Sequence, residues 1–195
     1  MLRFYLLKIL AHFIIISSLM CFLLLGGCAK YSEEVQANLT KLKTTKSCSG
    51  CDLTGIELVA FDLKNADLSG ANLTGANLSR VDLTEANLTD ANLSDAILVG
   101  AVLINAKLVN TNLSRVKLSY ANISGVDISN SLLLDASMNS SKILNSKISD
   151  TNMAGVNLHS ANLSGTKIDS KMLKDSVLCK TIMPSGQRDD SGCSG

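Results

Sequence analysis

The sequence predicts an all-β solenoid, in which the backbone coils repeatedly around a narrow core. Every fifth residue from Leu53 to Leu178 is Leu, Ile or Met, which makes 26 consecutive positions. The residue two places before each of them is most often Ala, and otherwise mostly Ser, Thr or Val. A period of five fits neither an α-helix, with 3.6 residues per turn, nor a plain strand, with a period of two. This regularity specifies an architecture and leaves little of the repeat for chemistry.

One unit, Ala71-Asn72-Leu73-Thr74-Gly75, shows how a period of five winds the chain. Ala71 and Leu73 are two residues apart, so they point the same way on an extended segment while Asn72 points the other way. Thr74 and Gly75 are turn formers. Each unit is therefore a flat face followed by a corner, and repeated units form a polygonal coil with the apolar pair inward. The backbone groups of each coil can then pair with the coils above and below.

Several units match the consensus Ala-(Asp/Asn)-Leu-x-x residue for residue, including 66–70, 71–75 and 161–165. In these units the sequence resembles the pentapeptide-repeat family. The resemblance implies a right-handed quadrilateral parallel β-helix over residues 48–178, with four units in each coil. The 26 units then give six and a half coils. A strand spacing of about 4.8 Å makes such a rod roughly 30 Å long.

The match to the consensus weakens along the chain. The outward residue before the Leu is acidic or Asn in the first nine units, from Asp52 to Asn92. Later units carry other residues there, namely Ile97, Val102, Lys107, Lys117, Leu132, Lys142, Lys147 and Lys167. Lys171 occupies a nominally inward position. We therefore expect the coiling to become irregular beyond about Ile168.

Both ends of such a rod need a cover, because an open β-helix exposes unpaired backbone edges and an apolar cross-section. Residues 28–47 are predicted as a tether followed by a short N-terminal capping helix, in which Val35, Leu39 and Leu42 form one apolar stripe. A flexible tether is the alternative for this segment. Residues 179–195 are predicted as a C-terminal capping loop, because they contain a Pro-Ser-Gly turn and a polar run.

Residues 1–27 are predicted as a lipoprotein-type signal peptide. A short basic region precedes a mostly apolar run over residues 9–25, which is marginal for spanning a bilayer and typical of an export signal. The run ends in Leu25-Gly26-Gly27-Cys28, which resembles the bacterial lipoprotein box. The resemblance implies cleavage before Cys28 and attachment of a diacylglyceryl group to this cysteine. An uncleaved membrane anchor is the alternative.

Either form of anchor places the protein at the cell membrane, outside the cytoplasm. Several acyl chains hold a protein stably at a bilayer, where a single chain binds only reversibly. In the lipoprotein family, Ala29 after the lipidated cysteine implies sorting to the outer membrane, on its periplasmic side, if the cell is Gram-negative.

Export to an oxidising compartment makes disulfides possible. Outside the signal and the lipidation site, the cysteines are Cys48, Cys51, Cys179 and Cys193, which allow three pairings. Cys51 and Cys179 lie at opposite ends of the rod that the family resemblance implies, whereas bonded cysteines have Cα atoms within about 7 Å. The pairs Cys48–Cys51 and Cys179–Cys193 remain.

The segment Cys48-Ser49-Gly50-Cys51 also has the spacing of a thioredoxin-type redox centre or of half a zinc site. No second cysteine pair or histidine lies near enough in the sequence for four metal ligands, and no strand-then-helix pattern surrounds it. Similar starts are common at the head of pentapeptide-repeat domains, so the resemblance implies a capping role. We expect no metal and no cofactor.

The sequence predicts a protein that is not an enzyme. The predicted mature chain has one histidine, His159, and no arrangement that resembles a catalytic triad or a general acid–base pair. The full sequence of 195 residues has a net formal charge of +1, but the charge is unevenly distributed. Residues 51–100 hold eight acids and two bases, a balance of −6, whereas residues 101–178 hold eight bases and five acids, a balance of +3.

Apolar residues gather at outward or corner positions within one coil, namely Ile97, Val99, Val102, Ile104 and Val109. Contiguous exposed apolar area often marks a contact surface. We interpret this belt as a site for an unknown protein partner or for self-association.

Two classes of function follow. The first is a membrane-anchored extracytoplasmic lipoprotein that acts as a non-catalytic binding or spacer module at the cell envelope. The second follows from the family resemblance alone, because quinolone-resistance members imitate DNA and bind type II topoisomerases. That role implies a cytoplasmic protein with a strongly negative rod, whereas this sequence carries an export signal and a net charge of +1. We expect no binding of nucleic acid.

Overall fold

The computed structural model describes residues 30–193 of the 195-residue chain. The chain divides into two units, Met1–Ser32 and Glu33–Gly195, and the fold considered below is that of the second. The predicted signal peptide, residues 1–27, and the predicted lipidation site, Cys28, lie outside the described residues. Within residues 30–193, no helix combines the length and the apolar character needed to cross a membrane.

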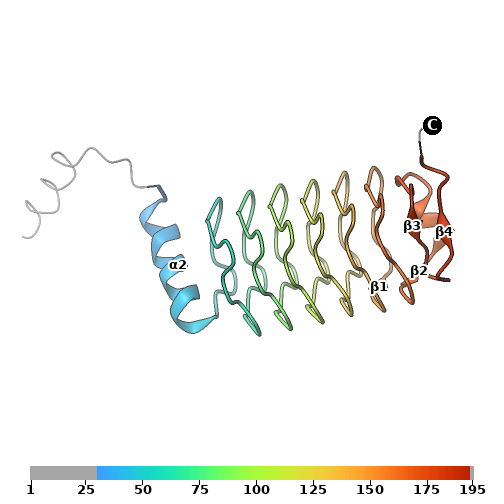
Figure 1. Ribbon diagram of the computed structural model, residues 1–195. Helices are drawn as coiled ribbons and strands as arrows, with labels where there is room; N and C mark the ends of the chain where they lie inside the picture. Colours follow the sequence, from blue (N-terminus) through green and yellow to red (C-terminus); the bar gives the residue numbers. More distant parts are fainter. Residues whose placement is uncertain (1–29, 194–195) are drawn as a thin grey trace, which may run out of the picture. The chain divides into compact units, whose positions relative to one another are not determined.

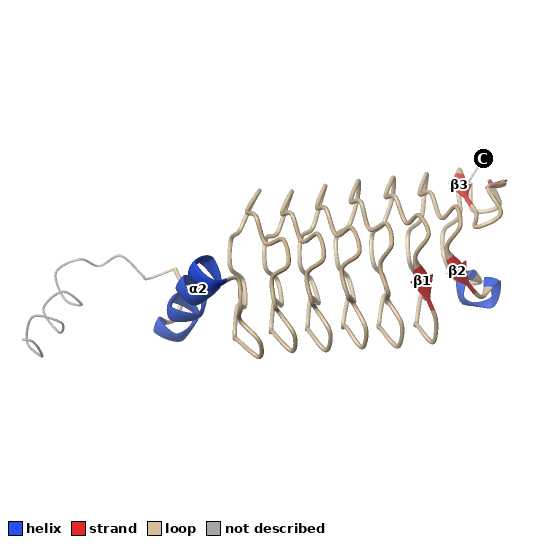
Figure 2. Cartoon of the chain, turned by 90° about the horizontal axis from the view of Figure 1, so that it is seen from below, coloured by secondary structure: helices blue, strands red, loops and turns tan. Residues whose placement is uncertain are grey.

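The second unit is a rod of stacked coils (Figures 1 and 2). Each bridging residue pairs in parallel with the residue 20 positions further on, from Ser47 with Asp67 to Asn162 with Ile182. Twenty residues hold four units of five, so each coil has four faces. A face is only three residues long, and most faces therefore contribute a single bridging residue rather than an extended strand.

Backbone hydrogen bonds between coils hold this register. The N–H of Asn72 donates to the carbonyl oxygen of Cys51 over 2.9 Å, and the carbonyl of Asn72 accepts from the N–H of Leu53 over 2.8 Å. The same two bonds recur in most of the following units. β1 (Lys147–Ile148) and β2 (Lys167–Ile168) are a two-residue form of this parallel pairing.

Each corner is a tight turn. The N–H of Ala71 donates to the carbonyl oxygen of Leu68 over 3.1 Å, which closes a four-residue turn. Its third residue, Gly70, has a φ of +64°, as a type II turn requires. Many later corners place other residues there, such as Asn105 at +57° and Tyr120 at +61°. The stacked coils thus impose a backbone conformation that costs an isolated L-residue about 1–2 kcal/mol.

The interior consists of stacked columns of side chains. Leu73, Ala76 and Leu78 have no exposed surface, and nearly all the other inward Leu, Ile, Met and Ala residues are also buried. Ser and Thr replace several inward Ala residues in the second half of the rod. Their hydroxyls donate to backbone carbonyls, as Thr151 does to Ile128 over 2.7 Å. Among the described residues, every buried side-chain nitrogen and oxygen atom has a hydrogen-bond partner.

Outward Asp and Asn side chains stabilise the corners. Oδ1 of Asp67 accepts from the backbone N–H of Ser69 over 3.2 Å and from its hydroxyl over 2.7 Å. Asn72 makes the same two bonds with Thr74. In such Asx turns the residue before the inward Leu accepts hydrogen bonds from the residue after it. This explains why Asp or Asn is favoured before the Leu, and why Ser or Thr often follows it in this sequence.

The helix α2 (Glu33–Thr45) occupies most of the predicted N-terminal segment. It buries Val35 and Leu42, two members of the predicted stripe. The side-chain amide of Asn38 donates to the carbonyl oxygen of Asp52 over 3.0 Å, so the helix contacts the first coil. Its role as a cap stays a prediction.

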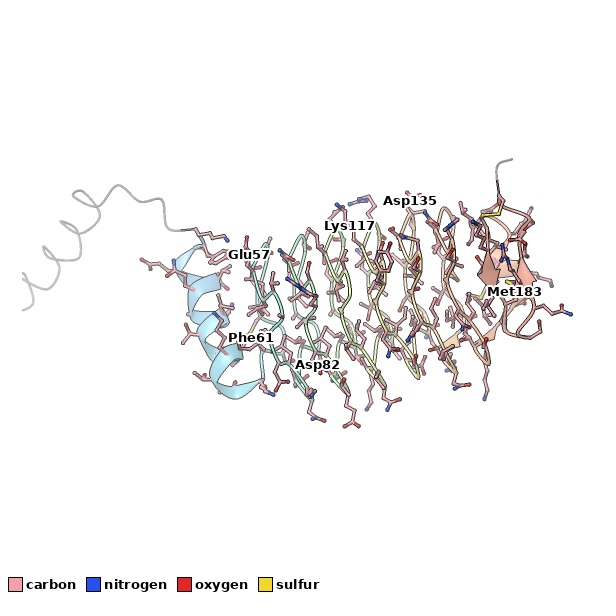
Figure 3. The ribbon with its side chains drawn as sticks, viewed as in Figure 1. Glu57, Phe61, Asp82, Lys117, Asp135 and Met183 are labelled. Carbon is pink, nitrogen blue, oxygen red and sulfur yellow. A yellow bond between two sulfur atoms is a disulfide. The ribbon has the colours of Figure 1, made fainter. Side chains whose placement is uncertain are left out.

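An aromatic residue lies beside this helix. Phe61 stands where the repeat usually has a small inward residue, and it is half-buried rather than enclosed. The ammonium group of Lys43 in α2 lies 6.0 Å from the centre of its ring (Figure 3). The large side chain is therefore accommodated at the end of the rod, next to the helix, where no preceding complete coil restricts it.

The coil is interrupted near its C-terminal end and then resumes. A short 3₁₀ helix, η1 (Ser170–Leu173), replaces one face, and Lys171 is exposed within it. A lysine ammonium group is too costly to bury without a partner, so this unit cannot close around the apolar core. Parallel pairing returns at Val177 and reaches Ile182. The irregularity expected beyond Ile168 is therefore local.

The predicted boundary between residues 178 and 179 lies one unit too early. Met183 keeps the five-residue phase, and Thr181 fills the small inward position with no exposed surface. β3 (Thr181–Ile182) stacks on the preceding coil, and β4 (Arg188–Asp189) folds back antiparallel to it. This hairpin, rather than a loop alone, forms the C-terminal end of the rod.

The Asx turn at Asp67 predicts a pH dependence of stability. The hydroxyl of Ser69, its backbone N–H and the amide of Asn87 all donate to the carboxylate, and they lower the pKa of Asp67 despite an opposing effect of partial burial. A lowered pKa in the folded state gives stability that is present above the unfolded-state pKa of about 3.9 and is lost as the pH falls through the folded-state value.

We expect Asp67→Asn to keep the acceptor and remove the titration. Thermal unfolding of the wild type should lose more stability between neutral pH and pH 3 than that of Asp67→Asn. Asp67→Ala, which removes the acceptor, should lose about 1–2 kcal/mol at neutral pH. Identical pH profiles for the wild type and Asp67→Asn would contradict this role of the carboxylate.

Candidate functional site

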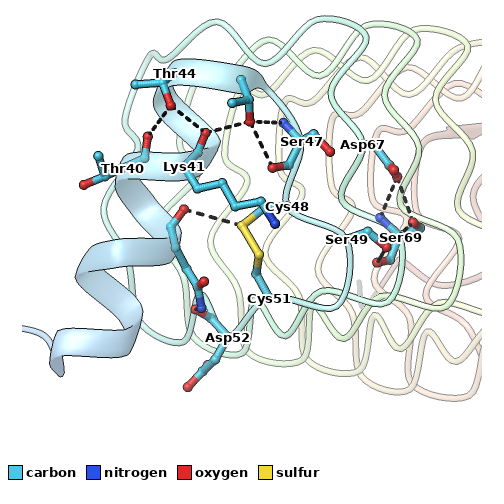
Figure 4. The surroundings of a disulfide bond; sticks show 12 residues. Thr40, Lys41, Thr44, Ser47, Cys48, Ser49, Cys51, Asp52, Asp67 and Ser69 are labelled. Atoms are coloured by element: carbon cyan, nitrogen blue, oxygen red, sulfur yellow. Dashed lines mark hydrogen bonds between the residues drawn. A yellow bond between two sulfur atoms is a disulfide. The ribbon is translucent and has the colours of Figure 1, made fainter.

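Cys48 and Cys51 form a disulfide at the first corner of the rod, with their Cα atoms 5.3 Å apart (Figure 4). Both residues are buried, because Cys48 takes the place of the inward Leu and Cys51 that of the small inward residue. The sulfur of Cys48 lies 3.4 Å from the carbonyl oxygen of Asn38 in α2. A disulfide enclosed by a helix is inaccessible to a redox partner. Its position supports a structural role.

Cys179 and Cys193 form the second disulfide, with Cα atoms 4.6 Å apart, so both predicted pairs are present. Cys179 is buried in the last coil and Cys193 is exposed. The bond ties the chain back to the coil after the β3–β4 hairpin. A Cβ atom at Gly192 would lie 2.7 Å from the backbone nitrogen of Leu178, so this close approach requires glycine.

Side chains that could carry chemistry do not converge in the described part of the chain. Within residues 30–193, no group of three or more His, Cys, Asp or Glu residues lies close enough together to hold a metal ion. His159 sits at a corner, where its backbone N–H donates to Oδ1 of Asn157 over 2.9 Å. We take the outward columns of the rod as the candidate site.

Each outward column lies on one of four faces. We number the faces of the first coil in chain order, so that Phe61–Leu63 is the third face and the same face of every later coil lies 20 residues further on. The third face then presents a column of outward residues that bridge to one another in parallel, namely Asp62, Asp82, Val102, Asn122, Lys142, Asn162 and Ile182.

The structure divides the predicted belt. Val102 lies on the third face, Val99 and Ile104 stand at its two corners, and Ile97 lies on the adjoining second face. Val109 belongs to the corner diagonally opposite Val99, so it is not part of the same surface. All five side chains are half-buried rather than fully exposed. We call Val99, Val102 and Ile104 the central row of the third face.

Within residues 30–193, none of the exposed large apolar side chains belongs to the predicted belt; they are Val59, Tyr120, Leu132, Leu134 and Val177. Tyr120 is 68% exposed, at the corner one coil above Gly100 and beside the central row. Leu132 and Leu134 are 49% and 39% exposed on the first face and its corner. Leu132 could have been found in the sequence by comparing residues 20 positions apart, because it interrupts a column of Asn residues. The predicted belt instead groups neighbours within one coil.

These apolar residues occur in pairs for a local reason. Many units have Asp or Asn before the inward Leu and Ser or Thr after it. Ile97 with Val99, and Leu132 with Leu134, have apolar residues at both of these positions. Because neither residue of such a pair is polar, no corner hydroxyl is left without its acceptor. The pair then presents apolar atoms where neighbouring coils present an Asx turn.

Ion pairs between coils neutralise part of the acidic half. Lys46 and Asp62 are 3.1 Å apart, and Lys64 and Asp82 are 3.2 Å apart. The backbone N–H of Lys64 and the side chain of Lys46 lower the pKa of Asp62. Exposed ion pairs of this kind contribute little to stability, because water screens them. Part of the acidic half therefore serves ion pairs within the rod, as it serves Asx turns at Asp67 and Asp82.

A family model described as pentapeptide repeats matches the chain with eight copies, over residues 47–84, 62–98, 96–133 and 145–170. These segments together cover more than half of the chain. The chain belongs to the pentapeptide-repeat family. As a pentapeptide-repeat protein, it has the four-sided coil that the 20-residue register shows. A search of curated proteins found no match.

Solved structures of other pentapeptide-repeat proteins are similar to this chain. A trypsin-treated variant of QnrB1, a plasmid-mediated fluoroquinolone resistance protein, is 17% identical, with 66% of this chain and 72% of that chain covered and a TM-score of 0.40. HetL, involved in heterocyst differentiation regulation in the cyanobacterium Nostoc sp. strain PCC 7120, is 22% identical, with coverages of 80% and 98% and a TM-score of 0.25. A protein of the Arabidopsis thaliana thylakoid lumen is 19% identical, with coverages of 75% and 79% and a TM-score of 0.31. At these identities the likeness concerns the repeat fold alone.

The C-terminal disulfide should stabilise the end of this pentapeptide-repeat rod. Replacing Cys179 and Cys193 together by Ser opens a ring of about 15 residues. In the chain-entropy model this lowers the free energy of unfolding by about 3 kcal/mol. We expect a lower unfolding midpoint and faster hydrogen exchange at the amides of Thr181 and Ile182. Cys48→Ser with Cys51→Ser, which opens a much smaller ring, should leave exchange at these two amides unchanged. Four free thiols in the unreduced wild-type protein, found by alkylation and mass spectrometry, would contradict both pairs.

Proposed function

We propose that this pentapeptide-repeat protein is a membrane-anchored, extracytoplasmic lipoprotein whose rod acts as a non-catalytic binding or spacer module at the cell envelope. The observation that carries the proposal is Leu25-Gly26-Gly27-Cys28 directly after an apolar run with basic residues before it. In this proposal Cys28 is lipidated, and the membrane is the first partner of the protein.

The rod is consistent with an extracytoplasmic position. Its two disulfides secure the first corner and the C-terminal end, and disulfides persist in oxidising compartments. α2 begins at Glu33, so only four residues separate it from Cys28. Four residues span at most about 14 Å. The anchor would thus hold the N-terminal end of the rod close to the bilayer.

A binding role is supported by the third face and its surroundings. The central row, with Tyr120 beside it, is an apolar area in the middle of the rod, with polar and charged residues on both sides of it along the third face. A contact surface commonly has this arrangement of an apolar centre and a polar rim.

Imitation of DNA for a type II topoisomerase stays the alternative. It needs free carboxylates in regular columns, whereas Asp62, Asp82 and Asp95 each pair with a basic side chain within the rod. The likeness to QnrB1 is at the level of fold and favours neither function. A soluble cytosolic pool of the protein would favour this alternative.

Labelling with radioactive palmitate and cell fractionation test the proposal. We expect the wild-type chain to carry label and to sediment with membranes, and Cys28→Ala to lose the label. Cys21→Ala, a cysteine change inside the predicted signal, is the matched control and should behave as the wild type. An unlabelled protein in the soluble fraction would contradict the proposal.

A further inference from the structure

The first five outward residues of the third face are complementary to themselves when their order is reversed. From the N-terminal side they are Asp62, Asp82, Val102, Asn122 and Lys142, and the column then continues beyond this segment with Asn162 and Ile182. Reversing these five residues about Val102 places Asp62 opposite Lys142 and Asp82 opposite the amide of Asn122. Val102 meets its own copy at the centre.

The corner columns beside this face have the same property. Arg80, Gly100 and Tyr120 follow one another along the corner that precedes the face. Reversal about Gly100 places the exposed ring of Tyr120 opposite Arg80, a pair that can make a cation–π contact. Gly100 itself has no side chain, and the side chain of Arg80 lies beside it, with Cγ 3.5 Å from where a Cβ atom of residue 100 would be. At the other corner Ile104 is central, with Thr84 and Ser124 opposite each other.

We propose that two copies of this chain pair through their third faces in antiparallel orientation, with the central row at the twofold axis. The axis lies in the plane of the interface and across the rods, so that each column meets its own reverse. Val99, Val102 and Ile104 pack against the same residues of the second copy. Lys142 pairs with Asp62 of the second copy at each end of the contact.

Charge decides between the two possible orientations. A parallel pair would place Asp62 opposite Asp62, Asp82 opposite Asp82 and Lys142 opposite Lys142. Like charges placed together across an interface suppress that arrangement. In the antiparallel pair no two like charges lie opposite each other in this column or in either corner column. Asp62 is paired with Lys46 of its own chain over 3.1 Å, but its side chain stays 63% exposed, and Lys142 is exposed, so the two can meet across the contact.

The contact is of modest size. Five coils at about 4.8 Å each give an interface roughly 20–25 Å long. Its area falls below the roughly 800 Å² per partner of a standard interface, so we expect a weak dimer in solution. The inference rests on the binding role proposed above and does not depend on the lipid anchor.

Crosslinking between two variants that each carry one added cysteine tests the orientation. The full chain is prepared with Asp62→Cys under one tag and with Lys142→Cys under another, purified in detergent, mixed and treated with a short bismaleimide. We expect a mixed dimer of the two variants and no self-crosslinked dimer of either alone. Val102→Cys, at the axis, should crosslink to itself. The wild-type chain supplies the background from its native cysteines.

Other outcomes overturn the proposal. Self-crosslinking of Asp62→Cys alone would show a parallel pair, and no product above the wild-type background would show that the third face does not pair. Lys167→Cys, on the fourth face, is the matched control and should not crosslink to Asp62→Cys. If Asp62→Cys does not fold, Ala60→Cys with Ser140→Cys makes the same comparison at the neighbouring corner.

Sedimentation gives a second, independent readout. We expect Lys142→Glu to raise the dissociation constant of the dimer by about tenfold or more, a change of about 1.4 kcal/mol. Lys167→Glu makes the same charge change on another face and should leave it unchanged. Equal effects of the two substitutions would contradict the assignment of the third face. Crosslinking and sedimentation use purified protein, so they can fail or succeed independently of the fractionation experiment.

Discussion

The parallel backbone pairing between residues 20 positions apart is the constraint on which the rest of the structure depends. It satisfies the backbone groups of three-residue faces that are too short to be strands by themselves. Because the register is constant, each position of the repeat becomes a straight column of side chains. Inward columns then need apolar residues or hydroxyls with a nearby carbonyl, and outward columns place residues of successive coils next to one another. Both the core and any binding surface are consequences of this register.

Much of the polar surface serves the fold. An Asp or Asn side chain and the Ser or Thr two residues later stabilise a corner together, as Asp67 and Ser69 do. The acidity of the first half therefore follows in part from turn formation, and ion pairs such as Lys64 with Asp82 neutralise more of it. Positions where the Asx pair is replaced carry more information about function. They include the central row of the third face and the exposed residues Leu132 and Leu134.

The sequence allowed the inward positions to be predicted, because a five-residue period leaves one way to bury Leu and Ala together. It also allowed both disulfides to be predicted, since rod length separates Cys51 from Cys179. The C-terminal boundary was misplaced because Met183 and Thr181 continue the phase beyond the change in composition. The predicted apolar belt includes Val109, which lies in the same coil as Val99 but at the opposite corner and so on a different surface. Exposure and pairing across coils depend on three-dimensional neighbours 20 residues away, which a search within one coil does not compare.

The 20-residue register is the central claim, and engineered disulfides test it most directly. Ser137 and Asn157 bridge in parallel on the second face, so their Cα atoms lie within the range that a disulfide spans. We predict that Ser137→Cys with Asn157→Cys forms a new intramolecular disulfide on oxidation, seen by peptide mapping of the unreduced protein. Ser137→Cys with Asn152→Cys, 15 residues apart and on different faces, should remain unbonded. Bond formation in the second pair and its absence in the first would contradict a four-sided coil.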